Sequence, residues 1–240
     1  MNGLRCFLLL CLHCSAFADS NSIKVATDEW LNYSNKDQSG YYFGLLQRVF
    51  PNYSYNVQFM PYLRSIAMLD QQQVDIVFGG AADDFARANC STFPIEIDRS
   101  DMLISPELAR HYHSPQDLIG KQVVSQLGYD WQDLLPEGVN YREYASLEQM
   151  IKLLHHKRVD AVLNYQEDIN YLLEQKPELA GDYVLVKNVL HYSSTFCFSA
   201  NPRGRYLQTR FDKTIPMLVS SGELKQLMLL ELGSDDNYPY

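Results

Sequence analysis

Residues 65–80 read SIAMLDQQQVDIVFGG, and residues 150–165 repeat the pattern as MIKLLHHKRVDAVLNY, 85 residues further along the chain. In each copy, apolar residues at helical spacing run into a polar segment. A Val-Asp pair then opens a short apolar run that is typical of a buried parallel strand. Two such helix-to-strand units predict two similar α/β lobes. Ligands of open α/β sheets bind beyond the carboxyl ends of the strands, so two facing lobes predict a cleft between them.

Residues 1–18 have the pattern of a cleavable signal peptide. Arg5 precedes the apolar run Cys6–Leu12, which is too short to span a bilayer. The segment Ala16-Phe17-Ala18 supplies the small residues that a signal peptidase needs. We therefore expect cleavage after Ala18 and an exported, soluble chain.

Removal of this leader changes the charge and the cysteine content. The remaining chain has 19 basic and 29 acidic residues, a net charge of −10, which does not suit nucleic acid or an anionic membrane surface as a partner. Cys90 and Cys197 are the cysteines that remain. In an oxidising compartment they could form a disulfide, and two separate buried thiols are the alternative.

The order of strands and helices follows from the apolar pattern and from capping residues. Alternating or apolar runs predict strands at 23–27, 55–59, 74–78, 102–105, 122–126, 184–186 and 195–198. Helices are expected over 40–50, after Pro61, after Ser114 and after Ser146. The segment 205–232 predicts helices that are broken near Pro216 and Gly222.

These motifs, in this order, resemble those of the bacterial extracellular solute-binding proteins of the family 3 type. Those proteins are the polar-amino-acid-binding components of ABC importers and their relatives. The resemblance covers nearly the whole chain after the leader. It is carried by Glu29-Trp30, Tyr62 and Arg64, 74–80, Arg87, Pro94, 117–124, Gly128, 159–162 and 221–227.

The resemblance implies an α/β, periplasmic-binding-protein-like fold in which two hinge strands join two lobes around a ligand cleft. We place the crossings near 95–101 and 187–194, so that lobe 1 comprises 19–96 and 194–240 and lobe 2 comprises 97–193. It also implies a periplasmic monomer that captures a small carboxylate-bearing, amino-acid-like solute and delivers it to an ABC permease. No cofactor and no metal are expected.

The resemblance assigns the binding of the ligand carboxylate to Arg87, because a guanidinium can donate two parallel charge-assisted hydrogen bonds. A surface arginine, or a partner for Asp83 or Asp84, is the alternative. Backbone groups of one turn would face the same ligand from lobe 1, and the start of a helix would face it from lobe 2. These residues are Gly79, Gly80 and Ala81 in lobe 1 and Gly128 and Tyr129 in lobe 2.

Tyr165 stands where the family often has an acid that holds the ligand ammonium, which argues against an α-amino acid ligand. Glu29, Glu167 or Asp168 could take that role, with solvent exposure as the alternative. Three aromatic residues are candidates to line the pocket, with burial in the core as the alternative: Trp30, Tyr33 and Tyr62. One arginine, Arg64, is a further candidate to bind an anion, with a solvated helix face as the alternative.

Other readings of the sequence remain open at this stage. Asp75 and Asp160 recur in the two copies, and we assign them a structural role because they open strands at the end away from the cleft. The family resembles, and includes, exported dehydratases of prephenate-like carboxylates, for which Glu29 is the candidate acid–base group. A sensory binding protein without a transporter is a further alternative. The histidines form no metal-binding signature, and phosphate-loop and nucleophile-elbow motifs are missing.

Overall fold

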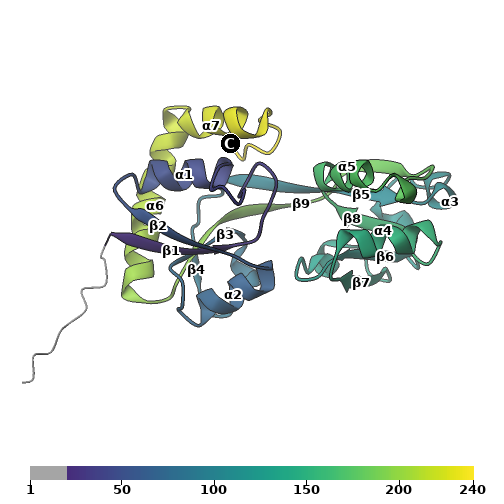
Figure 1. Cartoon of the computed structure of the whole chain (residues 1–240), viewed down its shortest axis with the longest axis horizontal. Coiled ribbons are helices and arrows are strands. Elements are labelled where there is room, and N and C mark those ends of the chain that lie inside the picture. Colours follow the sequence, from purple (N-terminus) through teal and green to yellow (C-terminus); the bar gives the residue numbers. More distant parts are fainter. Residues whose placement is uncertain (1–20) are drawn as a thin grey trace, which may run out of the picture.

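The computed structural model describes residues 21–240, in which two α/β lobes are connected by two long antiparallel strands (Figure 1). The predicted signal peptide lies outside the described residues. The strands are β1 (Ser22–Thr27), β2 (Ser54–Phe59), β3 (Ile76–Gly80), β4 (Asn89–Cys90), β5 (Glu96–Ile104), β6 (Gln122–Gln126), β7 (Asn140–Tyr144), β8 (Ala161–Asn164) and β9 (Val184–Phe198). The α-helices are α1 (Tyr41–Val49), α2 (Tyr62–Asp70), α3 (Pro106–Ala109), α4 (Leu147–His155), α5 (Gln166–Gln175), α6 (Pro202–Ser220) and α7 (Glu223–Leu232). Short 3₁₀ helices occupy Ala82–Asp84, Pro115–Leu118, Trp131–Leu134 and Pro177–Leu179.

Each lobe is built on the same arrangement of three parallel strands. In the first lobe β1 pairs in parallel with β2 and β3, and in the second lobe β6 pairs in parallel with β7 and β8. The continuous order of strands is β2-β1-β3-β9-β5-β8-β6-β7, and β4 pairs with β9. The two α/β lobes predicted from the repeated sequence are therefore confirmed.

The two repeated aspartates play matching structural roles. The carboxylate of Asp75 accepts a hydrogen bond from the N–H of Lys24 at 2.9 Å, and that of Asp160 accepts one from the N–H of Gln122 at 2.8 Å. The N–H of each aspartate donates to the carbonyl of the same partner residue. Each aspartate thus joins the beginning of its own strand to the beginning of the central strand. The predicted structural role of both residues is confirmed.

β5 and β9 form the connection between the lobes, and Figure 1 shows both running from one lobe into the other. The sequence predicted two short strands within 184–198, but the structure has one continuous strand. The middle of β9 is polar and partly exposed, so no burial pattern marks it. Its pairing with β5, for example Asp98 opposite Tyr192, makes it a strand.

The predicted break near Pro216 is wrong. Helix α6 continues through this residue to Ser220. Burial of Phe211, Ile215 and Leu218 in the core of the first lobe holds the helix together, although proline removes one backbone hydrogen-bond donor. The break at Gly222 is confirmed, because this glycine separates α6 from α7 with a left-handed φ of 80°.

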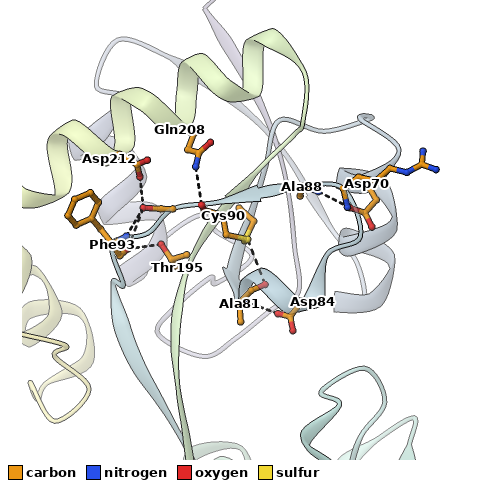
Figure 2. The surroundings of a disulfide bond; sticks show 12 residues. Asp70, Ala81, Asp84, Ala88, Cys90, Phe93, Thr195, Gln208 and Asp212 are labelled. Atoms are coloured by element: carbon orange, nitrogen blue, oxygen red, sulfur yellow. Dashed lines mark hydrogen bonds between the residues drawn. A yellow bond between two sulfur atoms is a disulfide. The ribbon is translucent and has the colours of Figure 1, made fainter. Parts of the chain in front are cut away.

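Cys90 and Cys197 form a disulfide between β4 and β9, which decides between the two alternatives left open by the sequence. The two residues lie opposite each other in the antiparallel pair. Figure 2 shows that α6 packs beside this pair, where the side-chain amide of Gln208 donates to the carbonyl of Cys90 at 3.0 Å. The disulfide therefore fixes the short edge strand β4 to the sheet of the first lobe.

We expect loss of the disulfide to destabilise the protein, because the bond closes a separation of 107 residues in the unfolded chain. The double variant Cys90→Ala/Cys197→Ala should lose about 2–4 kcal/mol of unfolding free energy in urea denaturation. Reductant should lower the stability of the wild type and leave that of the double variant unchanged. Equal stability of the wild type with and without reductant would contradict the prediction.

Candidate functional site

A cleft of about 930 Å³ lies between the two lobes, within the size range of small-molecule sites. Its walls come from both lobes and from both connecting strands. The first lobe contributes the loop after β1, the start of α2 and the end of β3, and the second contributes the loop after β6 and the start of α5. A smaller pocket of about 330 Å³ adjoins the cleft and shares Trp30, Tyr129 and Asp168 with it.

Most of the site residues predicted from the sequence line this cleft. Glu29 lines the smaller pocket instead, at the protein surface. Gly80 faces the interior, because a side chain there would meet the ring of Phe85 and the sulfur of Cys197. The predicted residues that the structure brings together in the cleft are Trp30, Tyr33, Tyr62, Gly79, Ala81, Gly128, Tyr129 and Tyr165.

The position of Arg87 contradicts the prediction that it binds a ligand carboxylate in the cleft. Arg87 is exposed and does not line the cleft. The carboxylate of Asp70, at the end of α2, accepts hydrogen bonds from the backbone N–H groups of Ala86, Arg87 and Ala88 at 3.0, 2.9 and 3.2 Å. Figure 2 shows Asp70 bonded to Ala88 in this way. These bonds hold the loop on the outer side of the lobe, as the surface alternative supposed. Arg64, exposed on α2, also lies outside the cleft.

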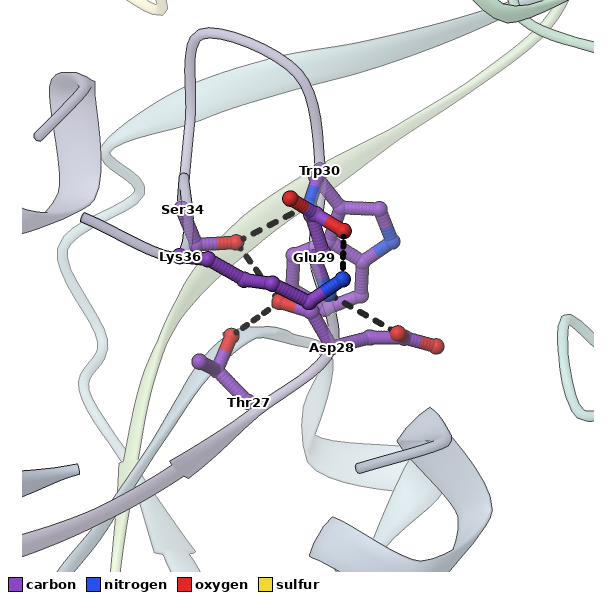
Figure 3. A network of polar contacts seen from close by, with 6 residues as sticks. All are labelled: Thr27, Asp28, Glu29, Trp30, Ser34 and Lys36. Atoms are coloured by element: carbon purple, nitrogen blue, oxygen red, sulfur yellow. Dashed lines mark hydrogen bonds and ion pairs between the residues drawn. The ribbon is translucent and has the colours of Figure 1, made fainter. Parts of the chain in front are cut away.

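Aromatic side chains form much of the cleft wall. Ring contacts connect neighbours on each side: Trp30 lies 5.5 Å from Tyr62 in the first lobe, and Tyr129 lies 4.7 Å from Trp131 in the second, centroid to centroid. Figure 3 shows how the backbone around Trp30 is fixed, since the hydroxyl of Ser34 accepts from its N–H and donates to the carbonyl of Asp28. The full set is Trp30, Tyr33, Tyr42, Tyr62, Tyr129, Trp131, Tyr165 and Tyr192.

Two carboxylates, Glu96 and Asp98, project into the cleft from the hinge strand β5. The side chain of Glu96 accepts a hydrogen bond from the phenol of Tyr42 through Oε1, while its buried Oε2 has no hydrogen bond within the described chain. Burial, together with the negative charge of Asp98, raises the pKa of Glu96 to about 8. Asp98 accepts from the phenol of Tyr165 at 2.8 Å, and burial raises its pKa to about 6.

Further carboxylates surround this pair, each with a different environment. Asp84 accepts from the phenol of Tyr62 and from the N–H of Ala81, both at 2.8 Å, and burial raises its pKa. Asp168, on α5, has no hydrogen bond or ion pair with any described residue. Burial and the nearby charges of Glu167 and Asp28 raise its pKa to about 6.

Basic side chains neutralise acids at the surface but not in the interior of the cleft. Lys36 pairs with Glu29 at 2.5 Å (Figure 3), and Glu148 pairs with both Lys152 and Lys176.

The lining of the cleft contains ten acidic residues and two basic ones. Arg99, one of these two, donates its Nε–H to the carbonyl of Asp236 at 3.3 Å, and Lys187, the other, is exposed. Acidic side chains therefore outnumber basic ones in the lining of the cleft.

Several residues of this site carry no signal that the sequence could provide. Tyr42 lies on a helix that packs on the core, and Glu96, Asp98 and Tyr192 lie on hinge strands. Acids at positions i and i+2 of a strand share a face, but the sequence does not show which face is buried. Only the pairing of β5 with β9 between two lobes places these side chains in the cleft.

The fold is found in many solved structures. An ABC uptake transporter substrate-binding protein from Streptococcus pneumoniae with bound histidine has a TM-score of 0.67 and 16% identity, with 91% of this chain and 95% of that one covered. An ancestral arginine-binding protein bound to arginine gives 0.69 and 16%, with 88% and 98% covered. The GluR0 ligand-binding core of Nostoc punctiforme with glutamate gives 0.66 and 18%, with 87% and 98% covered. No protein-family model and no curated protein match the sequence.

The chain therefore has the two-lobed, periplasmic-binding-protein-like fold that these amino-acid-binding proteins share. At 14–18% identity the likeness establishes the fold of this chain and leaves its ligand to be argued from the cleft. No helix among residues 21–240 is long and apolar enough to cross a membrane.

The raised pKa of Glu96 predicts how stability depends on pH. A carboxyl group whose folded pKa lies above its unfolded value stabilises the fold at low pH, and this contribution is lost as pH rises through the folded pKa. The unfolding free energy of the ligand-free wild type should therefore fall between pH 5 and pH 8. Glu96→Gln keeps an acceptor for Tyr42 and removes one titrating group, so this fall should become shallower by up to about 1.4 kcal/mol per pH unit.

Urea denaturation at pH 5, 6, 7 and 8 measures this difference. Glu107→Gln is the matched control, because Glu107 pairs with Lys157 on the surface at 2.8 Å. Identical pH slopes for the wild type and Glu96→Gln would show that Glu96 titrates normally in the folded protein.

Proposed function

We propose that this protein is an extracytoplasmic solute-binding protein whose lobes close on a small organic solute and deliver it to an ABC importer. The observation that carries the proposal is the cleft, which is lined by both lobes and by both strands that connect them. A ligand that contacts both lobes stabilises the closed arrangement relative to the open one.

The predicted lobes, residues 19–96 with 194–240 and residues 97–193, remain part of this proposal. Four clusters of buried apolar residues support the division, since two contain only residues before 96 or after 195 and two contain only residues from 102 to 190. Each lobe thus has its own core and can move as a unit about β5 and β9.

A contact across the cleft supports closure as the functional motion. Leu63 on α2 packs directly over Gly128, which follows β6 in the other lobe. A Cβ atom at Gly128 would lie 2.4 Å from Cγ of Leu63, closer than side-chain atoms approach each other. Gly128 therefore permits the two lobes to meet at this point.

Export and delivery rest on the predicted leader and on the transporters from which the structural neighbours come. Binding without chemical conversion is favoured over a dehydratase, because Glu29, the candidate acid–base group, is paired with Lys36 outside the main cleft. A sensory role is the second candidate, because the ligand-binding core of GluR0 has the same fold. We expect the functional unit to be a monomer.

Tryptophan fluorescence tests the proposed binding directly. Both tryptophans of the chain, Trp30 and Trp131, line the cleft from opposite lobes. A solute that binds there should change the emission with a saturable concentration dependence and raise the melting temperature. Amino acids, small amines and small acids form the panel. If none of them changes emission or melting temperature, the proposed function is wrong.

Replacement of Gly128 tests the closing motion. Gly128→Ala should weaken binding of any solute found in the screen at least tenfold, because the new methyl group would meet Leu63 when the lobes close. Gly120→Ala is the matched control, since Gly120 also has a positive φ, 77°, but no atom lies within 4 Å of the added Cβ. Both variants should incur a similar backbone cost of about 1 kcal/mol.

The double variant Leu63→Ala/Gly128→Ala separates closure from other effects of the substitution. Removal of the Leu63 side chain makes room for the added methyl group, so part of the affinity should return. Small-angle X-ray scattering should show ligand-induced compaction in the wild type and its loss in Gly128→Ala. Equal affinity of Gly128→Ala and Gly120→Ala would contradict the role given to this contact.

A further inference from the structure

We propose that the cleft binds a small organic cation, an amine or guanidine, and does not recognise a ligand carboxylate. This inference rests on the proposed solute-binding function and specifies the chemistry of the solute. It differs from the carboxylate-bearing, amino-acid-like solute that the family resemblance implies. Three independent features of the described chain support it.

The first feature is a buried carboxyl group without a counter-charge. Glu96 is 2% exposed and lines the cleft; hydroxyl groups of Tyr42, Tyr33 and Ser194 surround it, and Oε2 itself has no hydrogen bond of good geometry within the described chain. Its neighbour Asp98 lies two residues along the same strand face. A buried carboxylate without a counter-charge is costly, and a donor that carries positive charge is the group that offsets this cost best.

The second feature is the aromatic wall around these carboxylates. Tyr33 and Tyr42 lie on the first-lobe side, and Tyr165 and Tyr192 on the side of the second lobe and hinge. Aromatic faces attract cations through the ring quadrupole, and carboxylates among such rings add a direct charge interaction. The combination suits ammonium and guanidinium groups and repels an anion.

The third feature concerns the backbone donors that could bind an anion. The resemblance assigned this role to residues 79–81 in the first lobe and to Gly128 and Tyr129 in the second. Here the protein's own carboxylates occupy two of these donors, and the N–H of Tyr129 donates to the carbonyl of Gln126 at 3.2 Å. The N–H of Ala81 donates to Asp84 at 2.8 Å, and the N–H of Gly128 donates to Glu143 at 3.0 Å.

The start of α5 follows the same pattern. The N–H of Gln166 donates to the carboxylate of Asp101 at 2.9 Å. A ligand carboxylate would therefore compete with internal carboxylates at each of these three places. With Arg87 outside the cleft, Arg99 and Lys187 are the only cationic side chains in the described lining.

A metal ion does not fit these observations as well as an organic cation does. Within residues 21–240 no group of three or more His, Cys, Asp or Glu side chains is arranged to hold a metal ion. A cleft of about 930 Å³ is also far larger than a metal site and suits a solute of several heavy atoms.

Two pairs of compounds that differ only in a carboxylate test the proposal: agmatine with arginine, and cadaverine with lysine. Titration calorimetry and tryptophan fluorescence at pH 7 measure their affinities for the full chain after the leader. We expect agmatine, cadaverine or both to bind at least tenfold more tightly than the amino acid counterpart. Choline separates the contributions, because it has no ammonium N–H donor. If choline binds as tightly as the amines, the aromatic wall contributes more to the affinity for organic cations than hydrogen bonds from the ammonium group do.

Variants locate the cation in the cleft. Glu96→Gln should weaken binding of the preferred amine at least tenfold, since it keeps the shape of the side chain but cannot ionise to pair with the bound cation. Glu107→Gln, the same substitution at a surface ion pair outside the cleft, should leave the affinity unchanged. Circular dichroism confirms that both variants fold.

The outcomes distinguish this inference from the function on which it rests. If arginine, lysine, glutamate or a neutral solute binds as tightly as the amines, the cation inference is wrong and the solute-binding function stands. If an amine binds to the wild type and binds equally tightly to Glu96→Gln, the assignment of the site to Glu96 is wrong. If no solute of any class binds, the proposed function and the inference both fail.

Discussion

The antiparallel pairing of β5 with β9 is the constraint on which the rest of the structure depends. These two strands join sheets that otherwise belong to separate lobes, and their register places Glu96 opposite Ser194 and Asp98 opposite Tyr192. The register shifts between Ser100 and Met102. At this irregularity Asp101 accepts from the N–H groups of Gln166 and Asn188, which ties α5 and β9 to the hinge. The positions of the cleft side chains thus follow from the hydrogen bonds between β5 and β9 and from those that Asp101 accepts.

The same pairing imposes an electrostatic cost. It buries carboxylates where solvent cannot stabilise their charge, and the rise in pKa of Glu96 and Asp98 expresses this cost. A bound ligand that carries positive charge would offset this cost, and the free energy recovered would add to its affinity.

This chain shares its fold with amino-acid-binding proteins but does not place the predicted carboxylate-binding arginine in its cleft. The fold of those proteins is present over most of the chain, yet the arginine assigned to the carboxylate lies on the outer surface. The loop that carries Arg87 is held there by Asp70, a residue of the first repeat copy. At Ala81 and Gly128, two positions that the resemblance assigned to ligand binding, the backbone N–H groups donate to carboxylates of the protein itself. The same fold can therefore carry clefts lined by different chemical groups.

The sequence by itself determined the two α/β lobes, because the periods of buried helices and parallel strands appear in both repeat copies and are local properties. It also identified aromatic residues such as Trp30 and Tyr129 beside strand ends, where clefts form. Only the tertiary structure decided the register of the hinge strands, the disulfide and which acids line the cleft. Strand pairing, burial and the direction of a side chain depend on residues distant in sequence. The carboxylates of Glu96 and Asp98 become a site only when two lobes enclose them.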